Sequence, residues 1–136
     1  MEPLPLDLPT DLEERVDRLG REFLLEILEV ETERHPGNVE ALAELGHAYT
    51  REGRHADGLR IDLKLARLVP EDPTVHYNLA CSLSLLGRPD AALDALEKAI
   101  GLGYSDPEFM AQDEDLTALR EDPRFTELLD AMTHRA

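Results

Sequence analysis

The sequence predicts an all-α fold in which paired helices stack into a right-handed superhelical solenoid. One observation is the composition: of 136 residues, 42% are hydrophobic, only 4% are aromatic, and tryptophan is absent. An apolar set dominated by Ala and Leu favours helices over strands. The other two observations are an internal repeat of 34 residues and a set of helix-start signals with the same spacing. A chain of this length is expected to form a single domain, residues 1–136.

The repeat is visible when residues 38–71 are aligned with residues 72–105. Apolar positions, small residues and turn glycines then coincide; the pairs are Leu45 and Leu79, Gly46 and Ala80, Tyr49 and Leu83, Gly53 and Gly87, Gly58 and Ala92, and Ala66 and Ile100. Chance does not align three kinds of position together. Each segment of 34 residues is therefore expected to be one structural unit.

Helix starts are marked with the same spacing. Asn38, Asp72 and Asp106 are residues that commonly cap helix N-termini, and each is 34 positions from the next. Pro73 and Pro107 follow two of them at the first helical position, where proline is favoured. Each unit is expected to open with a helix at these residues.

Each unit is interpreted as two helices separated by a glycine. In the first helix the apolar residues recur at intervals of three, four and seven, which places them on one helix face. These residues are Leu42, Leu45, Gly46 and Tyr49 in one unit and His76, Leu79, Ala80 and Leu83 in the next. Gly53 and Gly87 then end the first helix. A hairpin this short cannot bury its own apolar face, so the units must stack on each other.

Asp62 departs from the pattern because it occupies the position that Leu96 fills in the next unit. Either Ile61 and Leu63 supply the missing apolar contact, or Asp62 is partly buried and hydrogen-bonded. A structural accommodation is favoured over a catalytic role, since most perturbed acids are not catalytic.

The N-terminal segment, residues 1–37, is less regular. Thr10-Asp11-Leu12-Glu13 has the pattern of a capping box, which predicts a helix start at Thr10. Residues 10–35 are interpreted either as one long helix or as a degenerate helix pair, and the two interpretations differ at Gly20.

The C-terminal segment, residues 106–136, begins a third unit in phase and then loses the pattern at Asp113. We expect it to form short, irregular capping helices, because an open end of a stack would expose its core. The acidic run 113–115 lacks the spacing of a calcium loop and is interpreted as a solvated cap.

These residues resemble the tetratricopeptide repeat family over positions 38–104. The resemblance rests on Leu45, Gly46, Tyr49, Gly58 and Pro70 in one unit, and on Asn78, Leu79, Ala80, Leu86, Gly87, Arg88, Ala92, Leu96 and Ala99 in the other. Short irregular helices like those expected at the C-terminus often close bacterial arrays of this family.

The resemblance implies a concave groove lined by the first helix of each unit. Carried over by position, the groove candidates are Glu40, Ala43, His47, Thr50, Thr74, Tyr77, Asn78, Cys81 and Ser84. The groove is expected to be polar and fairly neutral, with Tyr77 as its large anchor. Such a groove suits an extended peptide or a partner helix.

The charge of the chain limits its partners. Thirty acidic residues face 14 basic ones, a net charge of -16, so nucleic acid and anionic membranes are not expected as partners. The acidity is concentrated at the ends: residues 1–38 carry eleven acidic and four basic side chains, and residues 105–136 carry nine and three. The acidic ends either keep the stack soluble or steer a basic partner toward it.

The N-terminus lacks the pattern of a signal peptide, no apolar run is long enough to span a membrane, and Cys81 is the single cysteine. A cytoplasmic protein is therefore expected.

No constellation of catalytic or cofactor-binding residues appears in the sequence. The five histidines are scattered. His47 and Cys81 occupy equivalent positions on adjacent helices, but a metal site would need a further ligand, so a polar contact and a packing thiol are the favoured interpretation. We expect no cofactor, no metal and no enzymatic activity. The expected function is a non-enzymatic interaction module that binds a protein or peptide partner in the groove; the alternative is a structural subunit that self-associates, as a homo-oligomer, through its end or its convex face.

Overall fold

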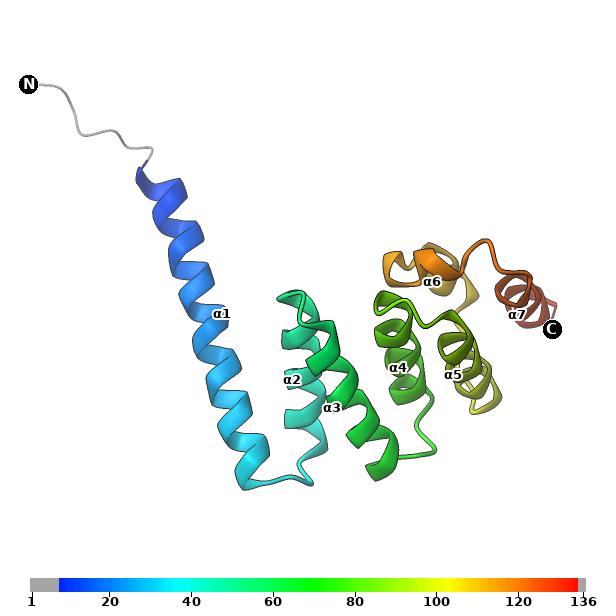
Figure 1. Ribbon diagram of the computed structural model, residues 1–136, viewed down its shortest axis with the longest axis horizontal. Coiled ribbons are helices and arrows are strands. Elements are labelled where there is room, and N and C mark those ends of the chain that lie inside the picture. The colour runs from blue at the N-terminus through cyan, green and yellow to red at the C-terminus, as the bar shows by residue number, and fades with distance from the viewer. Residues whose placement is uncertain (1–7, 135–136) are drawn as a thin grey trace, which may run out of the picture.

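The computed structural model describes residues 8–134, and within this range the only regular secondary structure is helical (Figure 1). The elements in chain order are α1 (Leu8–Arg34), α2 (Val39–Arg51), α3 (His55–Leu68), α4 (Pro73–Leu85), α5 (Pro89–Gly101), α6 (Pro107–Gln112), the 3-10 helix η1 (Glu114–Leu119) and α7 (Pro123–Thr133). The pairs α2–α3 and α4–α5 are the two predicted hairpins.

The predicted N-caps are confirmed. Asn38 Oδ1 accepts a 3.1 Å hydrogen bond from the backbone N–H of Ala41 at the start of α2. Asp72 and Asp106 cap α4 and α6 in the same way, through the N–H groups of Thr74 at 2.9 Å and Phe109 at 3.0 Å. These side chains satisfy backbone donors that have no partner inside the helix.

The two hairpin turns use glycine in a conformation that other residues rarely adopt. Gly53 and Gly87 have φ angles of +74° and +71°, directly after the ends of α2 and α4. Each turn then closes with a backbone hydrogen bond that reaches back into the helix: Arg54 N–H to the Tyr49 carbonyl at 2.8 Å, and Arg88 N–H to the Leu83 carbonyl at 2.9 Å. The predicted helix ends are confirmed, because only glycine takes this left-handed geometry without strain.

The hairpins are not separate cores. Val75 of α4 belongs to the apolar cluster formed mainly by α1, α2 and α3, and Leu59 of α3 belongs to the cluster formed by α4, α5 and the C-terminal helices. Each hairpin thus buries apolar surface against its neighbour, as the stacking argument requires. In Figure 1 helices α2 to α5 follow one another across the molecule in chain order.

Helix α1 is one uninterrupted helix of 27 residues that runs through Gly20, so the segment is a single long helix rather than a helix pair. The capping-box prediction is wrong, because the helix is already formed at Leu8 and Thr10 lies inside it. Pro9 is compatible with the first turn, where its missing N–H removes no intrahelical hydrogen bond.

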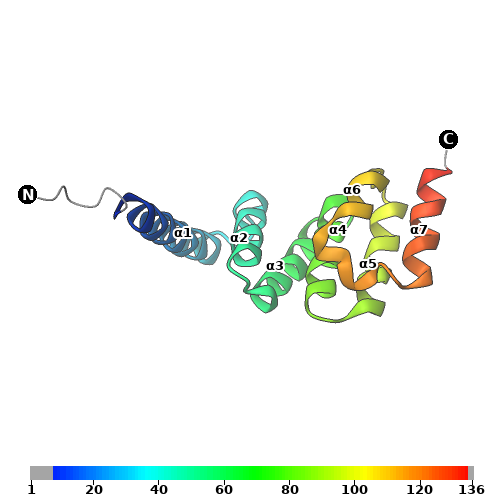
Figure 2. The same ribbon diagram turned by 90° about the horizontal axis from the view of Figure 1, so that it is seen from above.

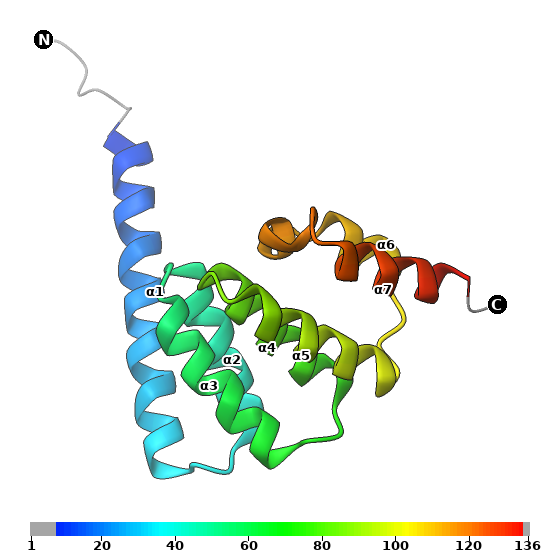
Figure 3. The same cartoon turned by 45° about the vertical axis from the view of Figure 1, so that its right-hand side comes forward.

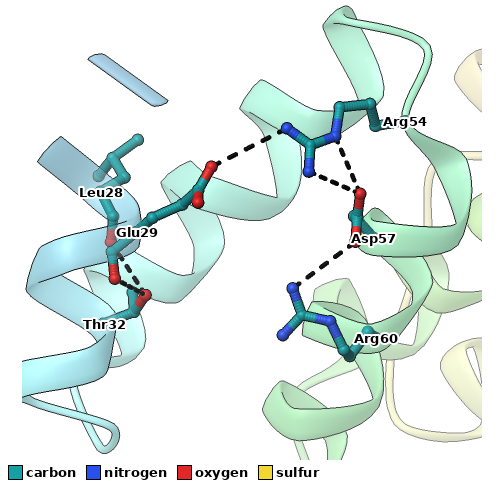
Figure 4. Close-up of polar contacts among 6 residues, drawn as sticks. All are labelled: Leu28, Glu29, Thr32, Arg54, Asp57 and Arg60. Carbon is teal, nitrogen blue, oxygen red and sulfur yellow. Dashed lines mark hydrogen bonds and ion pairs between the residues drawn. The ribbon is translucent and has the colours of Figure 1, made fainter. Parts of the chain in front are cut away.

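Only the C-terminal half of α1 packs against the array. Leu25 is buried and Leu28 is half-buried against α2 and α3, whereas every residue from 11 to 24 is exposed. The contact is completed by surface ion pairs: Arg21 Nε lies 3.0 Å from Glu52 Oε1, and Glu29 lies 3.9 Å from Arg54, as Figure 4 shows for the second pair. Figures 1 and 2 show the N-terminal half of α1 standing away from the other helices at one end of the molecule.

At the other end, the C-terminal segment turns back over the last hairpin (Figure 3). Met110, Leu116 and Leu119 are fully buried, and Phe125 of α7 is 2% exposed in the same cluster as α4 and α5. Helix η1 packs against α4 and α7 against α5. The segment therefore covers one face of α4, the first helix of the second hairpin.

Candidate functional site: a cleft between α2, α4 and the α6–η1 turn

A cleft of about 230 Å³ opens between α2, α3 and α4 and is bordered by the α6–η1 turn. Six of the nine groove candidates line it: Ala43, His47, Thr50, Tyr77, Asn78 and Cys81. The structure therefore brings the predicted faces of α2 and α4 together.

The other three candidates lie elsewhere. Glu40 is exposed on α2 beside Ala43 and Glu44, outside the cleft. Thr74 is exposed in the first turn of α4. Ser84 is 3% exposed, and its hydroxyl makes no hydrogen bond to the part of the chain that the structure describes.

Tyr77 does not present an open ring, which corrects its expected role as the groove's large anchor. The side chain is 5% exposed and donates a 2.6 Å hydrogen bond from its hydroxyl to Asp113 Oδ2. Its ring stacks on Tyr104, with centroids 4.3 Å apart and planes 13° from parallel, and Phe109 lies 6.1 Å away. Burial and the Asp113 carboxylate raise the pKa of Tyr77, so the phenol stays a neutral donor.

Cys81 is closed off by the same turn. Its Sγ lies 3.8 Å from Asp113 Oδ2, and burial, followed by the charges of Asp113 and Asp115, raises the pKa of the thiol. A thiol held in its neutral form is a poor nucleophile.

Three ligand atoms from Cys81, Asp113 and Asp115 lie within 4.8 Å of one another, which is close enough for the three groups to share a cation. Asp113 Oδ2 already accepts hydrogen bonds from Tyr77 and Cys81, so these contacts account for the cluster without an ion. His47, the partner that the sequence suggested for Cys81, is not part of this group.

Asp62 is 7% exposed, and its Oδ2 accepts a 2.5 Å hydrogen bond from the Ser82 hydroxyl of α4. It packs on Gly46, where a Cβ atom would lie 3.4 Å from Asp62 Oδ1. Ile61 is 1% exposed while Leu63 is 42% exposed. Both explanations for Asp62 thus apply in part: Ile61 supplies apolar contact, and Asp62 is buried with a hydrogen-bond partner.

Burial raises the pKa of Asp62 to about 6, although the hydrogen bond from Ser82 and the nearby His47 partly oppose the shift. Burial and the neighbouring Asp113 also raise the pKa of Asp115.

The cleft is acidic, which corrects the expectation of a fairly neutral groove. Asp62, Asp113 and Asp115 all line it, and no Lys or Arg is among its lining residues in the described chain. The prediction that Asp113 and Asp115 lie in a solvated cap is wrong, because both are half-buried. The signal was present: Asp113 is a good N-cap residue at the point where the 34-residue pattern ends, and its Oδ1 does cap η1 by accepting from Asp115 N–H at 3.0 Å.

Comparisons with known proteins agree with this fold. Residues 73–102, which cover α4 and α5, match the family model described as Tetratricopeptide repeat. A curated chloroplastic protein from Arabidopsis thaliana is 36% identical over 87 residues, which make up 62% of this chain and 26% of that protein. The chain thus spans about a quarter of the length of this relative.

Among solved structures, three of MamA are similar. "MamA MSR-1 C2" has a TM-score of 0.65 at 22% identity, covering 88% of this chain and 71% of that one. "Crystal structure of MamA protein" has a TM-score of 0.69 at 19% identity, covering 88% and 64%, and "MamA AMB-1 P212121" has 0.62 at 23% identity, covering 82% and 63%. At these identities the likeness shows the fold alone.

Residues 73–102 form a tetratricopeptide repeat, and the all-α solenoid prediction is confirmed. Repeats of this family build protein–protein interaction or assembly modules. In the part of the chain that the structure describes, no helix combines the length and the apolar character needed to cross a membrane.

Proposed function

We propose that the cleft binds a segment of a partner protein by taking up one of its cationic side chains, Lys or Arg. The observation that carries the proposal is the convergence of Asp62, Asp113 and Asp115 in one cleft whose lining, in the described residues, contains His47 but no Lys or Arg. Carboxylates without a Lys or Arg partner in a partly desolvated site favour a positively charged ligand.

The size of the cleft suits one side chain. At about 230 Å³ it is smaller than the range of about 300–1,000 Å³ in which small-molecule sites usually fall. A long, unbranched side chain that enters head first places its charged group among the carboxylates, while its aliphatic part contacts Ala43 and Leu85, which also line the cleft.

Two further residues extend the proposed contact along the partner's backbone. Asn78 is half-buried at the cleft, and its amide can both donate to and accept from an extended peptide. Phe109 lines the same cleft and is 56% exposed, so it offers a ring face to an apolar or guanidinium group of the partner.

The proposed role is binding rather than catalysis. The potential nucleophile, Cys81, is buried, and its surroundings raise its pKa. The cytoplasmic location expected from the sequence remains a prediction.

The test is a titration of the protein, followed by fluorescence anisotropy, with three sets of short labelled peptides matched in length: Arg- or Lys-containing, neutral and acidic. We expect the cationic set alone to bind, with an affinity that falls as salt is added, because salt screens charge pairs. Asp62→Asn and Asn78→Ala should each weaken binding several-fold. Glu127→Gln removes an equal charge from an exposed site on α7 and should leave binding unchanged.

Equal binding of the three peptide sets would contradict the proposal. So would an equal loss of affinity in Asp62→Asn and Glu127→Gln, because that result would report net charge rather than a site.

A further inference from the structure

The N-terminal helix carries an exposed apolar stripe that nothing described in the chain covers. Its members are Leu12, Val16, Leu19, Phe23, Ile27 and Val30, with exposed fractions between 47% and 64%. They recur at intervals of four, three, four, four and three residues, which places all six within one narrow face of a helix. Leu25 and Leu28, which pack toward α2, point to the opposite side of α1.

This arrangement is costly for a single copy. Residues 11–24 form almost four turns of helix in which every residue is exposed. An isolated helix of this length is only marginally stable in water, because most helix stability comes from packing of an apolar face. We therefore expect another helix of similar length to pack on the stripe.

We propose that α1 pairs with α1 of a second copy of this chain in an antiparallel, two-fold symmetric arrangement. This inference goes beyond the cleft and does not depend on what the cleft binds. It specifies the surface for the self-association that the sequence left as an alternative.

The spacing of the stripe residues is nearly the same in both chain directions, so two antiparallel copies of α1 can place their stripes against each other. When the two helices run in opposite directions and cross near residue 21, Leu12 lies opposite Val30 of the second copy, and Leu19 lies opposite Phe23. Val16 lies opposite Glu26 in this register, and its apolar neighbour is Ile27, one position out of register. Four of the six stripe residues thus pair directly and the other two meet side by side, so one surface can contact its own copy in an isologous interface.

The charges beside the stripe favour the antiparallel direction. The N-terminal half, residues 11–21, carries four acidic and three basic residues, whereas residues 22–34 carry five acidic residues and one basic residue. In the antiparallel register the less acidic half of one copy lies beside the more acidic half of the other, and Arg15 comes within one position of Glu26 of the second copy, twice by symmetry. A parallel, in-register pair would instead bring the two acidic halves, residues 22–34, side by side.

Gly20 supplies an independent observation. A glycine within a helix is unfavourable, and a Cβ atom at this position would meet nothing within 4 Å in a single copy. In the proposed pair Gly20 lies next to the crossing point, one position out of register with Phe23 of the second copy. The missing side chain there would leave room for the ring.

Pairing covers a continuous strip of six apolar residues between positions 12 and 30, each 47% to 64% exposed in a single copy. None of the six stripe residues lines the cleft, so pairing through the stripe covers no cleft residue directly. A dimer would present two clefts and bind a bivalent partner with avidity.

Sedimentation equilibrium across a range of concentrations tests the proposal. We expect a mass twice the 15.3 kDa of one chain, with dissociation on dilution. Phe23→Glu and Leu19→Glu should each weaken the dimer at least tenfold without loss of circular-dichroism helicity in α2 to α5. The matched control is Leu63→Glu, which places the same charge on another exposed apolar residue, 42% exposed on α3, and should leave the dimer intact.

Disulfide crosslinking tests the direction of the pair. In a Cys81→Ala background, Leu12→Cys protein is mixed with Val30→Cys protein and oxidised. We expect the mixed 12–30 link to predominate. Predominance of 12–12 and 30–30 links would overturn the antiparallel arrangement. A monomer at all concentrations up to about 100 μM, or a dimer that both stripe variants leave unchanged, would overturn the interface itself.

Discussion

The hydroxyl of Tyr77 donates a 2.6 Å hydrogen bond to Oδ2 of Asp113, which lies 36 residues further along the chain. The other oxygen of the same carboxylate, Oδ1, caps η1 through the N–H of Asp115 at 3.0 Å. Asp113 therefore starts the C-terminal 3-10 helix and fixes it to the inner face of α4. Together with the buried side chains of Met110, Leu116 and Leu119, this contact holds the segment over α4 and leaves a short, acidic cleft where the family implies an open groove.

Removing the Tyr77 hydroxyl should destabilise the protein. In Tyr77→Phe the Asp113 carboxylate loses a buried donor, which typically costs about 1–3 kcal/mol. Urea unfolding followed by circular dichroism measures the change. The control is Tyr49→Phe, at a buried tyrosine of α2 whose hydroxyl makes no side-chain hydrogen bond within the described residues; it should change stability far less. Equal losses of stability in Tyr77→Phe and Tyr49→Phe would mean that the hydrogen bond to Asp113 adds nothing to the stability of the fold.

Asp62 should make stability depend on pH. Its pKa is about 6 in the folded protein and near the ordinary aspartate value of 3.8 when unfolded, so the folded state binds the proton more tightly. Stability is then highest below about pH 4 for this group and decreases as the pH rises through 6, by on the order of 2–3 kcal/mol. Asp62→Asn removes the buried charge and should stabilise the protein at pH 7.5 but not at pH 4. Urea unfolding at both pH values measures this, and a variant that is less stable at pH 7.5 would contradict the assignment.

The same group should link peptide binding to pH. A cationic side chain in the cleft favours the ionised form of Asp62, so binding releases a proton when the pH is below about 6. Affinity for an Arg-containing peptide should therefore increase between pH 5 and pH 7, and Asp62→Asn should flatten that dependence. Anisotropy titrations across this range provide the test. An affinity that falls with rising pH would have the wrong sign for the proposed site.

Loosening the C-terminal segment should expose Cys81. Leu116 of η1 is fully buried, and Leu116→Ala should cost about 2–5 kcal/mol as a cavity in the packing between η1 and α4. Because Cys81 is the single cysteine, maleimide labelling followed by intact mass reports its exposure directly. We expect faster labelling in Leu116→Ala than in Leu42→Ala, which makes a similar cavity in the cluster of α1 to α3. Equal rates would indicate global unfolding instead of local release.

Much of the fold could be predicted because its signals are local. The caps Asn38, Asp72 and Asp106 and the turn glycines Gly53 and Gly87 act within a few residues, and the helix bounds follow them. The capping box failed for a related reason: its pattern is equally compatible with an interior turn, and the helix extends past it to Leu8.

The cleft could be predicted only on the α2 and α4 sides. The positions of His47 and Asn78 follow from the repeat, but Asp113 reaches Tyr77 through the path of an irregular segment, which no period specifies. The burial of Tyr77 and the acidity of the cleft both depend on that path. Whether the groove stays open therefore depends on how the irregular C-terminal segment folds over α4, which the repeat pattern does not predict.

The most direct test of the proposed site for a cationic side chain is a two-dimensional ¹H–¹⁵N NMR titration of the labelled protein with an Arg-containing peptide. We expect saturable shifts for the amides of His47, Asn78 and Asp113, with little change on α5 and α7. The absence of shifts at these three positions, or saturable shifts confined to α5 and α7, would contradict it.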